Sequence, residues 1–175
     1  AAASARVGAK TALITHNIKK IGEMSCNPAI GGLGKGHLVK EIDALDGLMA
    51  KAIDKSGIQH RILNKSKGPA VRGPRAQADR ELYKRAIQNF LKNQKLLSII
   101  EASVEDIEIF NNTINSVILH NSVKLYSKTV VLTAGTFLRG MIKIGNSSYS
   151  AGRIGDKPSI NLAKKIESLK FSIGR

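Results

Sequence analysis

A strand, a glycine-rich loop and a helix are predicted, in that order, by residues 11–45, TALITHNIKKIGEMSCNPAIGGLGKGHLVKEIDAL. The apolar run Thr11–Thr15 follows Gly8 and is typical of a buried strand. Five glycines and one proline between Gly22 and Gly36 favour a loop. Apolar residues then recur at helical spacing, so an amphipathic helix is predicted over Lys35–Asp46.

Downstream of this unit the sequence predicts a second turn and a longer helix. The stretch Lys65–Pro74 is rich in turn residues. An apolar stripe with helical spacing then predicts a helix over residues 75–95, which precedes a compact apolar run at Leu96–Ile100. The members of the stripe are Leu82, Ala86, Ile87, Phe90 and Leu91.

The middle of the chain favours short antiparallel strands. Ile107 and Ile109 alternate with acidic residues, as on a half-buried strand. Thr113–His120 and Val123–Tyr126 are further short strands joined by asparagine-rich turns. We therefore expect a small antiparallel insertion here.

The last third predicts a return to the main layer. Thr129–Thr133 is apolar and leads into Ala134 and Gly135, which indicates a buried parallel strand that ends at a ligand face. A helix is predicted over Pro158–Phe171, with four apolar residues facing inward: Ile160, Ala163, Ile166 and Leu169. The order of elements predicts an α/β nucleotide-binding layout.

Composition limits the class of protein and its partners. The chain has 175 residues, 42% of them hydrophobic, which suits one globular domain or part of one. No apolar run approaches the ~20 residues that span a bilayer, and the first ten residues have no apolar h-region, so secretion is not expected. Lys and Arg total 28 against 13 Asp and Glu, a net charge of +15. This excess favours nucleic acid or a phosphate-bearing cofactor as partner, although a lysine-rich surface is the alternative.

The glycine-rich loop carries the first candidate site. Its glycines beside Lys35 could bring backbone N–H groups to a phosphate at the start of the helix, or could form a surface turn. Cys26 lies in the same loop and is the only cysteine, which excludes an internal disulfide and fits a reducing cytoplasm. It is either a nucleophile or a small buried hydrophobic residue.

A basic turn carries the second candidate site. Arg72, Arg75 and Arg80 surround a proline-rich turn, and the first two would crowd one helix start unless an anion is bound. The turn is either an anion or RNA-phosphate site or a solvated basic surface. The four histidines are scattered without metal-ligand spacing, so no metal site is predicted.

Five runs of sequence resemble the MnmG (GidA) family, the flavin-binding subunit of the tRNA wobble-uridine 5-carboxymethylaminomethyl modification enzyme. The resemblance covers essentially the whole chain, and the second half of the first run and the core of the third are long and specific. The runs are THNIKKIGEMSCNPAIGGLGKGHLVKEIDAL, LMAKAID, ILNKSKGPAVRGPRAQADRELY, VVLTAGTFLRG and AGRIGDKPS.

The resemblance implies a fold, cofactors and partners. The fold would be α/β, a partial Rossmann-like FAD-binding domain with a small antiparallel β insertion, and residues 1–175 would be part of that one domain. The activity would use FAD, NADH and methylene-tetrahydrofolate to modify C5 of the wobble uridine of certain tRNAs. The implied partners are tRNA, a GTPase subunit and a second copy of the full-length protein, in the cytoplasm.

Three site residues follow from the resemblance. The functional cysteine of the family falls on Cys26, and its FAD contacts fall on Val104 and Ser159. The first strand of the family and its GGGHAG-type phosphate loop would precede Ala1, and its NAD-associated segment, second cysteine and partner-binding domain would follow Arg175. We therefore expect a chain that is truncated at both ends relative to the family and inactive alone. The alternatives are a non-catalytic remnant that binds RNA or a protein through its basic surface, and a general FAD or NAD oxidoreductase.

Overall fold

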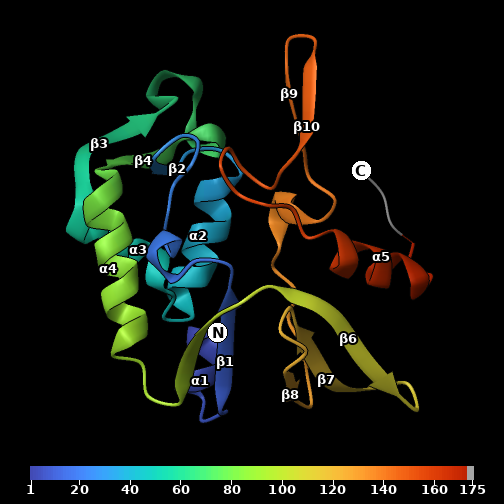
Figure 1. Ribbon diagram of the computed structural model, residues 1–175. Coiled ribbons are helices and arrows are strands. Elements are labelled where there is room, and N and C mark those ends of the chain that lie inside the picture. Colours follow the sequence, from blue (N-terminus) through green and yellow to red (C-terminus); the bar gives the residue numbers. More distant parts are fainter. Residues whose placement is uncertain (173–175) are drawn as a thin grey trace. The chain divides into compact units, whose positions relative to one another are not determined.

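The computed structural model describes residues 1–172, and the chain divides into two compact units, Ala1–Ile100 and Glu101–Arg175 (Figure 1). The first unit begins with the short helix α1 (Ala2–Arg6). The strands β1 (Thr11–Thr15) and β5 (Leu97–Glu101) then form a two-stranded sheet. Both strands were predicted from their apolar runs.

The centre of the first unit is a three-stranded antiparallel sheet with the order β2-β4-β3. The strands are β2 (Ala29–Gly31), β3 (Gly57–Leu63) and β4 (Gly73–Ala78). Helix α2 (Lys35–Ala44) lies where a helix was predicted, but of its apolar spacing residues only Val39 is buried, while Leu38 and Ile42 are 60% and 42% exposed. Helix α3 (Leu48–Ser56) follows it. Residues of these elements and of α4 form one buried cluster: Ile30, Val39, Ala52, Ile53, Ala76, Ala78 and Tyr83.

The predicted start of the long helix is wrong. Helix α4 spans Arg80–Lys92, and the preceding residues form β4, which pairs with β2 on one side and β3 on the other. The helix starts at Arg80 because Asp79 caps it by accepting a hydrogen bond from the Leu82 N–H at 2.8 Å. Leu82 was expected to be buried but is 47% exposed, and its neighbour Tyr83 is buried instead.

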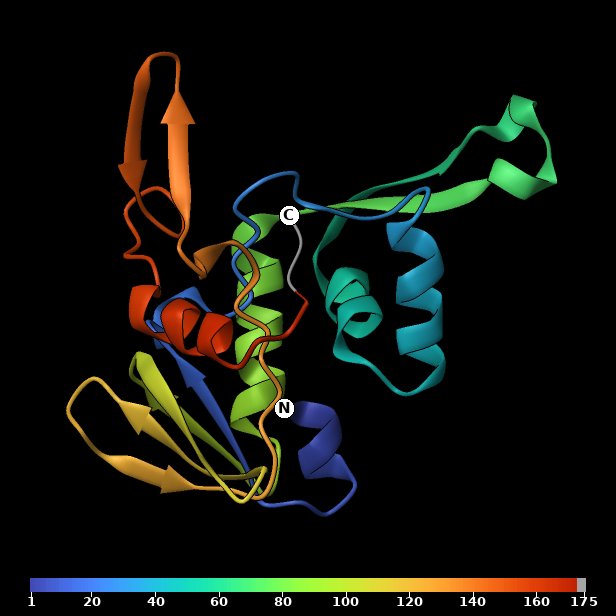
Figure 2. The same cartoon turned by 90° about the vertical axis from the view of Figure 1, so that its right-hand side faces the viewer.

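The long β3–β4 hairpin carries two short 3₁₀ turns between its strands (Figure 2). These are η2 (Lys65–Lys67) and η3 (Pro69–Val71), which agree with the predicted turn-rich stretch. A third 3₁₀ turn, η1 (Ile18–Lys20), follows β1.

The second unit contains the predicted antiparallel insertion. Strands β6 (Val104–Phe110), β7 (Thr113–Leu119) and β8 (Lys124–Tyr126) form a sheet in chain order. A hairpin of β9 (Met141–Ile144) and β10 (Ser147–Ser150) was not predicted.

The last helix, α5 (Ile160–Ser168), lies against β6. Its buried residues are Leu162 and Ala163, whereas Ile160 is 41% exposed and does not face inward as predicted. The 3₁₀ turn η4 (Gly135–Phe137) stands earlier in this unit.

The buried parallel strand predicted over Thr129–Thr133 does not form. These residues have no regular secondary structure, and Val131 is 81% exposed. A strand needs a hydrogen-bonded neighbour, and within residues 1–172 strand β1 pairs only with β5. None of the helices in the described part of the chain is long and apolar enough to cross a bilayer.

Candidate functional site

Cys26 lies on an exposed loop between η1 and β2, and its thiol is free. The guanidinium of Arg80 donates a hydrogen bond to the Cys26 carbonyl at 2.7 Å. Arg75 donates one to Oδ1 of the next residue, Asn27, at 3.2 Å. The interpretation of Cys26 as a buried hydrophobic residue is therefore wrong, because the thiol is accessible and its loop is held by two arginines.

The three predicted arginines make different contacts. Arg75 lies on β4 and also donates to Gln77 Oε1 at 3.2 Å, so its guanidinium is oriented beside the cysteine loop. Arg72 donates from Nε to the Lys65 carbonyl at 2.9 Å and thereby stabilises the tip of the hairpin. Arg75 lies within β4 and Arg72 precedes that strand, so the expectation that they crowd one helix N-terminus is wrong.

Several backbone donors of the glycine-rich loop are bonded within the chain. The N–H groups of Gly32, Lys35 and Gly36 donate to carbonyls of Pro74, Leu33 and Gly32 at 2.9–3.0 Å. Lys35 Nζ turns back to the Ala29 carbonyl at 3.0 Å. These groups are bonded within the chain, which weakens the interpretation of the loop as a phosphate cradle.

The two faces of the β2-β4-β3 sheet differ in chemistry. A groove of about 370 Å³ lies on the helix side, and its charged lining residues are Lys40, Asp54, Arg61 and Arg75. Its apolar lining comes from the core of the first unit and includes Ile30, Val39, Ile53 and Ala76.

The opposite face is polar and includes a residue that sequence analysis missed. Arg61 on β3 stands directly across from Arg75 on β4, and Gln59 stands across from Gln77. Side chains directly opposite one another in an antiparallel pair lie on the same face. The alternation of Gln59 and Arg61 in the sequence could have indicated a polar strand face, but it does not reveal the partner strand.

Val104 and Ser159 lie on adjoining segments of the second unit. Val104 begins β6, and Ser159 is the N-cap residue of α5. Glu105 accepts a hydrogen bond from Asn161 Nδ2 at 2.7 Å, which links the two segments. The Ser159 N–H donates to the Phe137 carbonyl at 2.8 Å, so its backbone donor is used within the chain.

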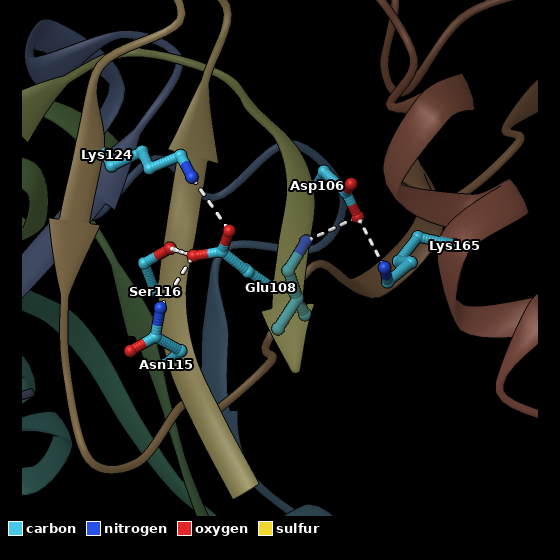
Figure 3. Close-up of polar contacts among 7 residues, drawn as sticks. Asp106, Glu108, Asn115, Ser116, Lys124 and Lys165 are labelled. Carbon is cyan, nitrogen blue, oxygen red and sulfur yellow. Dashed lines mark hydrogen bonds and ion pairs between the residues drawn. The ribbon is translucent and has the colours of Figure 1, made fainter. Parts of the chain in front are cut away.

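A dense polar cluster on the same sheet is structural (Figure 3). The Glu108 carboxylate accepts hydrogen bonds of 2.7 Å from Asn115 Nδ2, Ser116 Oγ and Lys124 Nζ. These donors lower the pKa of Glu108 to about 2, with Lys124 contributing most. Donors from β7 and β8 thus satisfy one carboxylate of β6. Within residues 1–172 no group of three histidine, cysteine or acidic side chains could hold a metal ion.

A protein-family model and a curated relative match this chain in sequence. The family described as "Glucose inhibited division protein A" matches residues 1–175. The tRNA uridine 5-carboxymethylaminomethyl modification enzyme MnmG of Granulibacter bethesdensis is 59% identical over 178 residues, which is 100% of this chain and 28% of that protein. The chain thus spans little more than a quarter of the length of this relative.

Solved structures give the same result. The structure of Aquifex aeolicus GidA in its form II crystal is 46% identical over 97% of this chain and 28% of its own, with a TM-score of 0.92. The GidA-related protein of Thermus thermophilus is 17% identical over 99% of this chain and 65% of its own, with a TM-score of 0.66, and shows the fold alone. The predicted α/β fold with its antiparallel insertion is confirmed.

Proposed function

The chain belongs to the glucose inhibited division protein A family, and on that premise we propose that it is part of an enzyme that modifies C5 of the wobble uridine of certain tRNAs. The name of the Granulibacter relative supports this substrate. The observation that carries the proposal is the accessible thiol of Cys26 on a loop that Arg75 and Arg80 hold in place. A polyanionic substrate also suits the net charge of +15.

Cys26 is the nucleophile in this proposal. The carbon C5 of uracil becomes reactive when a nucleophile adds to C6, because the ring electrons then move toward C5. An exposed cysteine can make that addition as its thiolate; C5 then bonds to the one-carbon unit, and loss of the C5 proton to a base lets the thiolate leave C6. The bond from Arg80 to the Cys26 carbonyl positions the loop without consuming the thiol.

FAD is the proposed cofactor, and Val104 and Ser159 are its proposed contacts. The Ser103 carbonyl accepts from the His120 N–H at 3.0 Å, toward β7. Because backbone groups alternate along a strand, those of Val104 point away from β7, as pairing with an adenine edge requires. Ser159 would contact the cofactor through its hydroxyl, since its N–H already donates to Phe137. When bound, FAD supplies the redox chemistry of the reaction.

The remaining partners belong to the proposal for the whole enzyme. They are NADH and methylene-tetrahydrofolate as co-substrates, and a GTPase subunit and a second copy of the protein as partners. A tRNA substrate would place the enzyme in the cytoplasm.

The test is to compare the complete gene product with its Cys26→Ser variant. We expect the variant to bind flavin and tRNA but to form no modified uridine, because the thiol is lost while the loop backbone is kept. Modified nucleosides are measured by mass spectrometry of digested tRNA. Full modification by the variant would exclude Cys26 as nucleophile, and tRNA binding without modification by the wild type would favour the non-catalytic alternative.

A further inference from the structure

Two arginines on the polar face of the β2-β4-β3 sheet stand directly opposite each other. Arg61 and Arg75 form one cross-strand pair, and Gln59 and Gln77 form the pair two positions along. The residues between them, His60 and Ala76, take the other face of the sheet. The four polar side chains therefore share one surface.

Like charges directly opposite one another destabilise a sheet unless a counter-charge lies between them. In the described part of the chain no carboxylate forms an ion pair with either arginine, and Asp54, which lines the same groove, bonds to neither. Arg75 donates to two neutral acceptors, Asn27 Oδ1 and Gln77 Oε1. Arg61 is exposed and has neither an ion pair nor a side-chain hydrogen bond with any residue in the described part of the chain. The facing pair therefore favours an anion as its ligand.

We propose that Arg61 and Arg75 clamp a single phosphate of the RNA backbone beside Cys26, an inference that rests on the proposed function. Guanidinium groups bind phosphate oxygens through two parallel N–H donors, so two facing arginines suit one phosphodiester. Gln59 and Gln77 supply further amide donors on the same face.

The clamp is joined to the cysteine loop by a direct contact. Arg75 bonds to the side chain of Asn27, the residue after Cys26, at 3.2 Å. A phosphate held between the arginines therefore belongs to the nucleotide presented to Cys26 or to its immediate neighbour. The clamp would position the uridine, and Arg61 is a positioning residue rather than a catalytic one.

The test measures binding of an anticodon stem-loop RNA to the complete gene product as a function of salt. We expect Arg61→Gln with Arg75→Gln to weaken binding about tenfold and to lower the salt slope by about 1, the value for one phosphate contact. Arg85→Gln is the control because it removes one charge from an exposed position on α4 that has no described partner. Flavin content and thermal unfolding establish that each variant is folded, and Arg61→Lys, which keeps the charge, should retain most of the slope.

A neutral-backbone probe identifies the phosphate. Stem-loops that each carry one methylphosphonate near the wobble uridine are bound to the wild type and to the double variant. We expect one position to weaken binding to the wild type and to have no effect on the double variant.

Four results would overturn the clamp. An unchanged slope would place the RNA elsewhere, and a slope loss of about 2 would mean two separate phosphates. Loss of flavin with RNA binding intact would assign the arginines to a cofactor phosphate. A wild type that does not bind the RNA would overturn the clamp and the proposed function together, whereas the first three results leave the proposed function standing.

Discussion

Arg80 donates a hydrogen bond of 2.7 Å to the backbone carbonyl of Cys26, a residue 54 positions earlier in the chain. Arg80 is the first residue of α4, and Asp79 caps that helix. The position of the thiol therefore depends on where α4 begins. The sequence predicts Arg80 as an RNA contact, and in the structure its guanidinium bonds to the loop that carries Cys26.

Replacing Arg80 by alanine should loosen the cysteine loop. We expect turnover to fall about tenfold, the unfolding free energy to fall by about 1 kcal/mol, and RNA affinity to change little, because the bond is made to the loop backbone. Steady-state kinetics on tRNA and urea denaturation measure these quantities. Arg85→Ala is the matched control on the same helix. A variant with normal turnover and weakened RNA binding would return Arg80 to the role predicted from the sequence.

Replacing Gly31 by alanine should prevent the sheet from forming. Gly31 has φ +113°, and an added Cβ would lie 2.1 Å from the Pro74 carbonyl oxygen and 2.8 Å from Arg75 Cα. We expect a loss of at least about 3 kcal/mol in unfolding free energy, because both neighbours are backbone atoms of β4.

Gly34→Ala is the control for Gly31. Gly34 has φ +74° but no atom within 4 Å of an added Cβ, so only about 1–2 kcal/mol of backbone strain is expected. Urea denaturation compares the two variants. Equal losses of unfolding free energy would show that the close contact with β4 is not the reason why position 31 needs glycine.

The sequence predicts elements that depend on local pattern and misses those that depend on distant pairing. The strand Thr11–Thr15, helix α2 and the β6–β8 sheet were all predicted from periodicity. The β2-β4-β3 sheet was missed because its three strands come from separate parts of the chain. The run Thr129–Thr133 fails for the reverse reason, since its apolar pattern predicts a strand but nothing in the described residues pairs with it.

Pro74 explains why β4 was taken for a turn and a helix start. Proline in a central strand normally removes a ladder hydrogen bond. The Pro74 carbonyl accepts a hydrogen bond from the Gly32 N–H at 3.0 Å, so it faces the β2 side of β4. The nitrogen of Pro74, which has no hydrogen to donate, faces the same side, just beyond Gly31, the last residue of β2. No bond to β3 is lost. The same pairing brings Arg61 opposite Arg75, which no local pattern could reveal.

Replacing Asp79 by alanine should shorten or fray the start of α4. The Asp79 carboxylate accepts from the Leu82 N–H at 2.8 Å, and removal of such a cap costs about 1 kcal/mol. Asp79→Ser keeps an acceptor and should recover most of this stability. Urea denaturation of both variants tests the effect, and equal losses from alanine and serine would assign the contribution of Asp79 to something other than capping.

Protonation of Glu108 should make the protein less stable in acid. Its pKa in the folded protein is lowered from 4.5 to about 2, because Lys124 donates a hydrogen bond to the carboxylate and Ser116 and Asn115 donate two more (Figure 3). The folded state therefore favours the charged form. The resulting stability is fully present above pH 4.5 and is lost as the pH falls from there toward about 2.

Glu108→Gln should remove this part of the acid dependence. We expect the variant to be less stable than the wild type at pH 7, because the ion pair with Lys124 is lost while an amide oxygen can still accept from Ser116. The difference in unfolding free energy should shrink as the pH falls below 4.5, since the wild-type carboxylate then becomes neutral as well. Urea denaturation at several pH values measures it. Glu81→Gln controls for net charge. It removes the same charge from an ion pair with Lys84 on α4, in which the Glu81 side chain is 63% exposed. A constant difference between Glu108→Gln and the wild type from pH 7 to pH 2 would mean that the three donors do not hold Glu108 in its charged form.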